Sequence, residues 1–314
     1  MPIDLLTIGE ALVEVMRTDI DQPLTREGPF IGPYPSGAPF IFAVQAARLN
    51  MNCVALGSVG DDAFGECLRN QLKKDSINAD YIQIMSDQTT GVAFVAYNAD
   101  GSRNFVFSLG AGQYLPETLL EPSLFKDLRC LHLMGSTLAL SEQALATGKK
   151  ALQLAKSNGA KFSFDPNLRP ELMPIEKAKV VFAPFIEAAD VLIPTEDELL
   201  SLIDSKTVDN AIMLLMEANP ARIIVITQGK AGCTIYHKDK IEQVTGFSVE
   251  EVDPTGAGDC FDAGFLSGWL SSKSLYDSAQ LANACGALAV TKQGPMAGAA
   301  KLERVQAFMD GYDG

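Results

Sequence analysis

Short apolar runs alternate with helical patterns along most of this chain. Four of the runs, CLHLMGS, KFSFDPN, DVLIPTE and RIIVITQG, lie between residues 130 and 229, and each ends in polar or turn residues. Apolar strands separated by helices are typical of a mostly parallel sheet covered on both faces, so we predict an α/β fold. Ligands in such folds bind beyond the carboxyl ends of the strands. The polar or turn residues at those ends are Asp165, Asn167, Thr195, Glu196, Thr227 and Gly229.

One region departs from this alternation. Residues 91–109, GVAFVAYNADGSRNFVFSL, consist of two alternating apolar and polar runs joined by NADGS, which is a hairpin signal. The stretches ALVEVMRTD and GPFIGPYPSG also look extended. We therefore expect a small antiparallel sheet, formed by roughly residues 11–35 and 90–110 and inserted in one domain that spans residues 1–314. Its apolar face has to cover a ligand or another copy of the chain.

The charge and cysteine content exclude several classes of protein. The 314 residues include 25 Lys and Arg against 39 Asp and Glu, a formal net charge of −14. Nucleic acids and anionic membranes reward positive charge, so we expect neither as the main partner. The six cysteines form no C-x-x-C pair, and no apolar run approaches the length of about 18 residues that spans a membrane. We therefore expect a cytoplasmic protein, in which an anionic ligand needs local positive potential from backbone amides and a few arginines.

The stretch DPTGAGDCFDAGFLSGWL, which begins at Asp253, carries the clearest chemistry. FDAGFLSGWL has helical spacing, so TGAGD lies at a helix N-terminus, where free amides and the helix dipole favour an anion. Gly256 and Gly258 allow the backbone to approach a phosphate closely. Asp259 would repel that anion, so we interpret it as a general base for a hydroxyl group while the amides of Gly256, Ala257 and Gly258 stabilise a transferred phosphoryl group. The alternative is a glycine-rich helix start with Asp259 as a cap.

The same stretch resembles the C-terminal signature of the ribokinase-like (PfkB) family of sugar kinases. Residues 35–65, PSGAPFIFAVQAARLNMNCVALGSVGDDAFG, resemble the family's N-terminal signature, and GEALVE, SFDPNLRP, PTEDE, TQGKAG and LANACGALAVTKQG occur in family order. The resemblance covers nearly the whole chain. It implies a ribokinase-like three-layer αβα fold with a small β-sheet lid, and an enzyme that transfers the γ-phosphoryl group of ATP to a sugar hydroxyl with the help of Mg²⁺.

The resemblance also implies roles for residues on the ATP side. Asp259 matches the catalytic base, and residues 256–258 match the anion hole around the γ-phosphate. Asp253 and Thr255 stand where family members often bind a monovalent cation such as K⁺. Glu198 keeps the glutamate of the family's Asn-x-x-Glu motif, which holds Mg²⁺ through water, whereas Thr195 replaces the asparagine; an acidic helix N-terminus is the alternative for this segment. The remaining positions implied to lie along ATP are Thr227, Gly229, Gly232 and Asn283, with a strand-to-strand turn and helix packing as their alternatives.

Another set of positions would contact the sugar. Glu14 stands where the family carries an acid that binds sugar hydroxyls, and Ser36 and Gly37 offer close backbone contact. Ile41 replaces the asparagine that usually faces the sugar. Arg169 in DPNLRP could reach the sugar or the phosphate, or could form a surface ion pair.

The lid hairpin bears on the choice of sugar. Phe105, Phe107 and Tyr97 are expected over the sugar, with sheet packing at a dimer contact as the alternative. Kinases for 2-keto-3-deoxygluconate typically place an arginine near the end of the second lid strand, and the corresponding place in this chain is Ser108, while Arg103 lies close to the turn. A bidentate arginine is the natural partner of a carboxylate, so its absence favours a neutral sugar.

The motifs GEALVEVM and GPYPSGAP are most similar to those of bacterial ketohexose kinases, for tagatose first and for fructose next. Two alternatives stay open, a 2-keto-3-deoxygluconate kinase and a catalytically inactive regulator that binds sugar. The partners implied are a sugar, ATP and a second copy of the chain that pairs through the lid.

Overall fold

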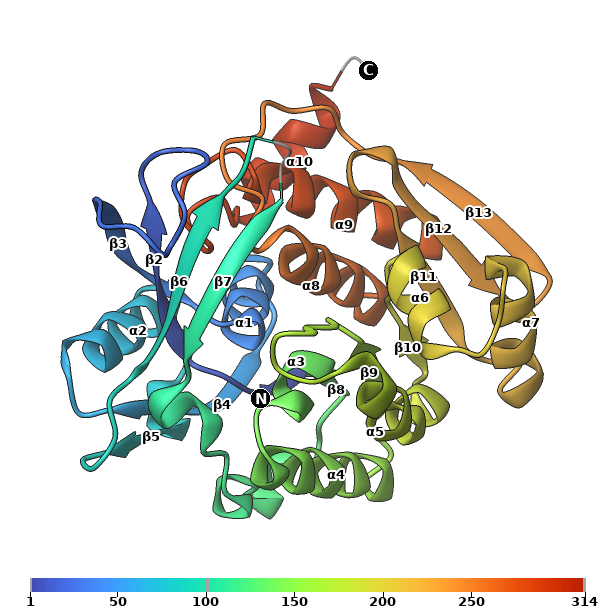
Figure 1. Ribbon diagram of the computed structural model, residues 1–314. Helices are drawn as coiled ribbons and strands as arrows, with labels where there is room; N and C mark the ends of the chain where they lie inside the picture. Colours follow the sequence, from blue (N-terminus) through green and yellow to red (C-terminus); the bar gives the residue numbers. More distant parts are fainter. Residues whose placement is uncertain (1, 100–101, 313–314) are drawn as a thin grey trace.

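A mixed nine-stranded sheet forms the centre of the molecule, as the computed structural model shows for residues 2–99 and 102–312 (Figure 1). The strand order is β13-β12-β11-β10-β9-β8-β1-β4-β5. The pairs from β5 to β11 are all parallel, and only β11–β12 and β12–β13 are antiparallel. The strands are β1 (Leu5–Ile8), β4 (Cys53–Gly60), β5 (Ile82–Met85), β8 (Cys130–Met134), β9 (Lys161–Asp165), β10 (Val191–Leu192), β11 (Ile223–Thr227), β12 (Gly232–His237) and β13 (Lys240–Thr245). The predicted mostly parallel sheet is confirmed.

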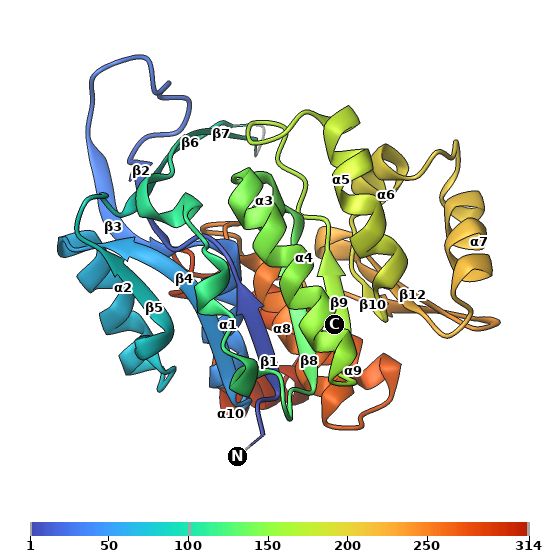
Figure 2. The same ribbon diagram turned by 90° about the horizontal axis from the view of Figure 1, so that it is seen from below.

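Helices cover both faces of this sheet and create two separate hydrophobic cores (Figures 1 and 2). Neighbouring strand residues alternate between them, since Leu5 belongs to one core and Leu6 to the other. The helices of the first face are α1 (Ala38–Arg48), α2 (Ala63–Lys74), α8 (Ala257–Leu270), α9 (Leu275–Ala289) and α10 (Leu302–Asp310). Those of the second face are α3 (Gly135–Ala139), α4 (Glu142–Ser157), α5 (Ile175–Ala188), α6 (Glu196–Leu202) and α7 (Val208–Ala218). Among the described residues, no helix combines the length and the hydropathy needed to cross a membrane.

A second sheet of four strands, in the order β3-β2-β6-β7, projects from the main body (Figure 2). Its strands are β2 (Leu12–Arg17), β3 (Phe30–Ser36), β6 (Gly91–Tyr97) and β7 (Arg103–Ser108). The expectation of an antiparallel sheet was wrong for the central pair, because β2 and β6 run parallel. β2 follows β1 and β6 follows β5, and β1 and β5 run in the same direction in the large sheet. The chain therefore enters the small sheet in the same direction both times. The residues Asp100 and Gly101 of the expected NADGS turn lie outside the described residues.

Helix α8 is buried along most of its length, and small residues set its position. Residues 259–268 are all buried. A Cβ atom added to Gly264 would lie 2.7 Å from Cα of Ala282 in α9, and one added to Gly268 would lie 2.8 Å from Cα of Ser278. The two helices therefore pack backbone to backbone (Figure 1). This close contact holds the N-terminus of α8 in a fixed place near the carboxyl ends of the parallel strands.

Arg48 at the end of α1 joins three parts of the first face. Its Nε and Nη2 atoms donate to the two carboxylate oxygens of Asp75 at 2.7 and 3.0 Å. Its Nη1 atom donates to the carbonyl oxygens of Met296 and Ala299 at 2.9 and 2.6 Å. The side chains of Arg48 and Asp75 are only 12% and 6% exposed. The fork geometry of a guanidinium is what allows one side chain to hold all four acceptors.

Replacing Arg48 by alanine is expected to lower the free energy of unfolding by about 3–5 kcal/mol, because the buried carboxylate of Asp75 would lose its cationic partner and keep only the hydrogen bond from Gln71. Chemical denaturation measures this loss. The matched control is Lys179→Ala, which removes the exposed ion pair with Glu176 and should cost less than about 1 kcal/mol. An equal loss in both variants would contradict the role assigned to the buried pair.

Candidate active site

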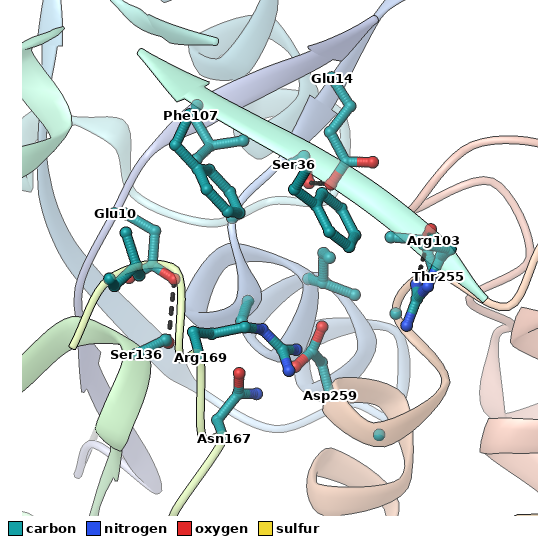
Figure 3. Close-up of a pocket in the computed structure, with 18 of the residues that line it drawn as sticks. Glu10, Glu14, Ser36, Arg103, Phe107, Ser136, Asn167, Arg169, Thr255 and Asp259 are labelled. Atoms are coloured by element: carbon teal, nitrogen blue, oxygen red, sulfur yellow. Dashed lines mark hydrogen bonds between the residues drawn. The ribbon is translucent and has the colours of Figure 1, made fainter. Parts of the chain in front are cut away.

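A pocket of about 140 Å³ lies between the small sheet and the N-terminus of α8 (Figure 3). Its walls come from β2, β3, the start of α1, β7, α3, the segment that follows β9, and the first residues of α8. The predicted site residues that the fold brings together here are Glu14, Ser36, Gly37, Phe105, Phe107, Arg169, Thr255, Gly256, Ala257, Gly258 and Asp259. The predicted residues that do not line this pocket are Thr195, Glu198, Thr227, Gly229, Gly232, Asp253 and Asn283.

The N-terminus of α8 presents free backbone amides to the pocket. Gly256 is the N-cap residue and has a left-handed backbone conformation with φ of 83°. A Cβ atom there would lie 2.6 Å from the carbonyl oxygen of Pro295, so only glycine fits. No side chain caps the helix, which excludes the alternative that Asp259 serves as the cap. The amide of Ala257 donates to the carbonyl oxygen of Pro254 at 3.4 Å, whereas the amides of Gly258 and Asp259 have no acceptor within the described chain. These two amides are available to a ligand that accepts hydrogen bonds.

Asp259 lines the pocket one residue after Gly258, and its side chain is largely buried. Burial raises the pKa of its carboxyl group well above the ordinary value, and the nearby Asp165 raises it further, while the charge of Arg169 opposes the shift. Arg169 extends toward Asp259 from the other side of the pocket (Figure 3). It forms no ion pair with any described residue, so the alternative of a surface ion pair does not hold.

Two buried oxygen atoms on pocket residues lack a hydrogen-bond partner within the described chain. One is Oε2 of Glu14, whose other carboxylate oxygen accepts a 2.5 Å hydrogen bond from the hydroxyl of Ser36. Burial raises the pKa of Glu14 to about 7, although the Ser36 hydrogen bond counteracts the rise. The other is Oδ1 of Asn167, whose backbone and side-chain amides donate to Asp165. Buried acceptors of this kind have to find a donor, and hydroxyl groups of a ligand can supply it.

Sequence reasoning missed Glu10 and Ser136, which also line the pocket. Glu10 accepts hydrogen bonds from the hydroxyls of Ser136 and Thr137 at 3.1 and 3.0 Å (Figure 3 shows the first). Burial raises the pKa of Glu10. Glu10 and Ser136 follow β1 and β8 closely, so the rule applied to the carboxyl ends of the later strands could have found both.

The small sheet contributes residues that alternate between its two faces. Phe105 and Phe107 line the pocket and stack with their ring centroids 5.5 Å apart, whereas Val106 and Ser108 are exposed. Ser108 therefore does not occupy a ligand-facing place, and the argument from an arginine missing there was wrong. Arg103 has the same parity as the two phenylalanines and lines the pocket, so its nearness to the turn does not keep it from the site. Arg103 is the first residue of β7, and its side chain reaches Thr255, just before the start of α8.

The other predicted ATP-side residues lie outside the pocket and have local structural roles; they are Thr195, Glu198, Thr227, Gly229, Gly232 and Asn283. Thr195 and Glu198 form a reciprocal capping box on α6, and Oε1 of Glu198 also accepts a hydrogen bond from the amide of Leu168 at 2.7 Å. The expected acidic helix start is thus confirmed for this segment. Thr195 pairs with Thr227 across a parallel bridge, which brings two of the predicted residues together.

Gly229 and Gly232 both have positive φ angles at the turn between the antiparallel strands β11 and β12. The side-chain amide of Asn283 donates to the carbonyl oxygens of Val244 and Thr245, both at 3.2 Å, and so ties α9 to β13. The alternatives considered for these residues, a strand-to-strand turn for the glycines and helix packing for Asn283, are therefore both observed. Gly229 is exposed, whereas Gly232 and Asn283 are buried.

Asp253 lies directly behind the N-terminus of α8 and is buried. Its Oδ1 atom accepts hydrogen bonds from the amide of Thr255 at 3.0 Å and from the hydroxyl of Tyr97 at 2.7 Å, and its Oδ2 atom accepts one from the amide of Gly294 at 2.8 Å. Tyr97 does not line the pocket, so the expectation that it covers the ligand was wrong. Within residues 2–99 and 102–312, no three His, Cys, Asp or Glu side chains converge in a way that could hold a metal ion alone.

Comparison with known proteins gives a family and a set of similar proteins. A family model described as "pfkB family carbohydrate kinase" matches residues 3–302. Among curated proteins, fructokinase-2 of Solanum habrochaites is 33% identical over 300 residues, which cover 92% of this chain and 91% of the relative, and probable fructokinase-2 of Arabidopsis thaliana is 31% identical over the same shares. Among solved structures, a candidate ribokinase II from E. coli in complex with ATP and Mg²⁺ has a TM-score of 0.92 and 36% identity, covering 98% of this chain and 99% of that one. Fructokinase from Vibrio cholerae O395 with fructose, ADP and a calcium ion has a TM-score of 0.84 and 26% identity over the same shares.

The two glycines of the α8 N-terminus should respond differently to alanine. Gly256→Ala is expected to lower the free energy of unfolding by about 1–3 kcal/mol, because it forces a positive φ and a contact with Pro295. Gly258→Ala should leave stability unchanged or slightly higher, since its added Cβ meets no atom within 4 Å and alanine favours helix. Its methyl group would enter the pocket, so this variant should still weaken the binding of an anion. Thermal unfolding of the two variants measures this difference. Equal losses of stability would contradict the conformational requirement assigned to Gly256.

Proposed function

The chain belongs to the pfkB family of carbohydrate kinases, and we propose that it transfers the γ-phosphoryl group of ATP to a hydroxyl group of a neutral ketohexose, fructose or tagatose. The observation that carries this proposal is the composition of one pocket. The helix N-terminus at residues 256–258 and the buried carboxyl group of Asp259 form one wall, and the unpartnered oxygens of Glu14 and Asn167 belong to the others. Amides that can donate hydrogen bonds to a phosphoryl group therefore stand opposite oxygen atoms that can accept hydrogen bonds from sugar hydroxyls.

Asp259 is the proposed general base. Its raised pKa makes the ionised carboxylate a stronger base, which suits the removal of a proton from a weakly acidic hydroxyl. As the sugar oxygen bonds to the γ-phosphorus, its proton passes to Asp259, and the bond from phosphorus to the β,γ-bridging oxygen breaks to leave ADP. The amides of residues 256–258 stabilise the charge on the phosphoryl oxygens during this transfer.

Glu198 is the proposed ligand of hydrated Mg²⁺. Burial raises the pKa of Asp165 to about 7, and the neighbouring charge of Glu198 adds to that rise. A carboxyl group beside a second carboxylate is a suitable environment for a divalent cation, and oxygen ligands with retained waters are what Mg²⁺ prefers. The ion would neutralise phosphate charge. The nucleotide itself is proposed to lie along Thr195, Thr227, Gly229, Gly232 and Asn283.

A monovalent cation such as K⁺ is proposed at Asp253 and Thr255. Three hydrogen bonds occupy the carboxylate of Asp253, which leaves about one of its four lone-pair sites for a cation. The carboxylate of Asp253 could therefore make about one contact with the cation.

The small sheet is proposed to act as the lid. Phe105 and Phe107 form its apolar wall over the pocket and would exclude water, so that ATP is not hydrolysed in place of transfer. The opposite face exposes Phe30 and Val106, which we propose to pair with a second copy of the chain. All six cysteines are free, in keeping with a cytoplasmic enzyme.

A neutral sugar is favoured over a sugar acid. The carboxyl groups of Glu10, Glu14 and Asp259 line the pocket, and they accept hydrogen bonds from hydroxyls but repel a substrate carboxylate. The two curated relatives reported above carry the name fructokinase. The second candidate is a kinase for a sugar acid such as 2-keto-3-deoxygluconate, because Arg103 and Arg169 both reach the pocket.

A substrate panel tests the proposal. Purified protein with ATP and Mg²⁺ is expected to phosphorylate fructose or tagatose with kcat/KM at least tenfold above that for 2-keto-3-deoxygluconate, ribose or adenosine. A coupled assay for ADP measures the rates. A preference for the acid would establish the second candidate, and sugar binding without turnover of any sugar would indicate an inactive regulator.

Asp259→Asn is expected to lower kcat by at least about 10²-fold, the usual contribution of a general base. The base works only when ionised, so turnover of the parent should be present above the pKa of Asp259 and lost as pH falls through it. Because that pKa is raised, the acid limb should lie above the range of an ordinary aspartate, about pH 4. The control Glu14→Gln should keep the acid limb of kcat while raising KM for the sugar. A loss below about tenfold in Asp259→Asn would remove the assignment.

A further inference from the structure

Helix α8 carries a second buried acid, which the proposed mechanism does not use. Asp262 lies one turn after Asp259, and only 2% of its surface is exposed. The ion pairs of the described residues give it no lysine or arginine partner. Burying a carboxyl group without a cation is costly, and an apolar side chain would suit this place in the helix better. The cost indicates that Asp262 makes a specific contact.

The surroundings of Asp262 keep its carboxyl group neutral. Burial raises the pKa of this group well above the ordinary value, and the charges of Asp165, Asp259 and Glu198 raise it further. His132 lies nearby, with its Nε2 atom 3.5 Å from Oδ2 of Asp262. It cannot take the proton, because burial lowers the pKa of its imidazole to about 3. A neutral carboxyl group carries an O–H donor, which an ionised carboxylate lacks.

A chain of hydrogen bonds leads from Asp262 to the pocket. Its side chain is hydrogen-bonded to that of Asp165 at the end of β9. The two oxygens of Asp165 accept from the backbone amide and the side-chain amide of Asn167 at 2.8 and 3.1 Å. These bonds hold Asn167 at a φ of 36°, in the left-handed region that mainly glycine favours. Asn167 lines the pocket, and its Oδ1 atom has no partner within the described chain.

We propose that Asp262 is a positioning residue, whose O–H group donates to Asp165 and thereby fixes Asn167 against α8. This inference rests on the proposed kinase function. Asn167 belongs to the sugar side of the pocket, whereas α8 supplies the phosphoryl side with Asp259 (Figure 3). The hydrogen bond therefore sets the spacing between the sugar and the group that it attacks. Such spacing matters, because a misplacement of about 1 Å can lower a rate by about 10²-fold.

Two substitutions separate the hydrogen bond from the shape of the side chain. Asp262→Asn keeps a donor toward Asp165, so affinity for fructose and tagatose and kcat/KM should stay within about threefold of the parent. Asp262→Leu has a similar shape and no donor, so both quantities should fall by at least about tenfold in a protein that is still folded by thermal unfolding. The control Ser267→Ala removes another buried polar group of α8 and should match the parent. Calorimetry measures sugar affinity, and a coupled assay for ADP measures turnover.

A double-mutant cycle tests the route through Asn167. Asn167→Gly removes the side chain, and glycine accepts the positive φ without strain. Adding Asp262→Leu to Asn167→Gly should weaken sugar binding by no more than about threefold, because the group that Asp262 positions is already absent. A loss as large as in the parent background would overturn the route.

An infrared measurement gives a readout independent of the kinase reaction. The parent at neutral pH should show the C=O stretch of a protonated carboxyl group that is missing from Asp262→Asn. If the parent has this band but phosphorylates no sugar in the panel, the proposed function fails while the hydrogen bond stands. Absence of the band would overturn the inference, as would an Asp262→Leu variant that binds and phosphorylates sugar like the parent.

Discussion

The free amides at the N-terminus of α8 are the constraint on which the rest of the site depends. Gly256 takes a backbone conformation that leaves no capping side chain, and the first turn of the helix faces the pocket. The helix cannot move to satisfy those amides elsewhere, because residues 259–268 are buried and Gly264 brings its backbone against α9. The packing therefore leaves these amides available to a ligand that accepts hydrogen bonds.

The pocket contains positive groups although the whole molecule is strongly negative. The chain carries a net charge of −14, which would repel ATP at long range. Amides of α8 and the guanidinium groups of Arg103 and Arg169 provide positive potential at one place. Burial raises the pKa of Glu14 to about 7 and also raises the pKa of Asp259 above its ordinary value. The low exposure of these side chains thus allows acids that can accept hydrogen bonds from hydroxyl groups to lie a short distance from the proposed phosphoryl site.

The sequence predicted those features that depend on short stretches of chain. The parallel sheet, the helices between its strands and the glycine-rich start of α8 are confirmed because each follows from local periodicity or spacing. The errors concern relations between distant segments. The parallel pairing of β2 with β6 depends on how two separate excursions leave the large sheet. The outward direction of Ser108 and the inward direction of Arg103 depend on the pairing register of β7, which a motif alignment by eye does not fix.

The sequence by itself determined the fold class, the family and the place of the anion-binding helix start, because these are written in residues that are neighbours along the chain. Only the tertiary structure decided that Glu10 and Asn167 join Glu14 in one pocket, and that Tyr97 holds Asp253 instead of covering a ligand. These contacts link residues up to 156 positions apart. Such contacts depend on side-chain direction and burial after the two sheets have packed, and no local pattern encodes that arrangement.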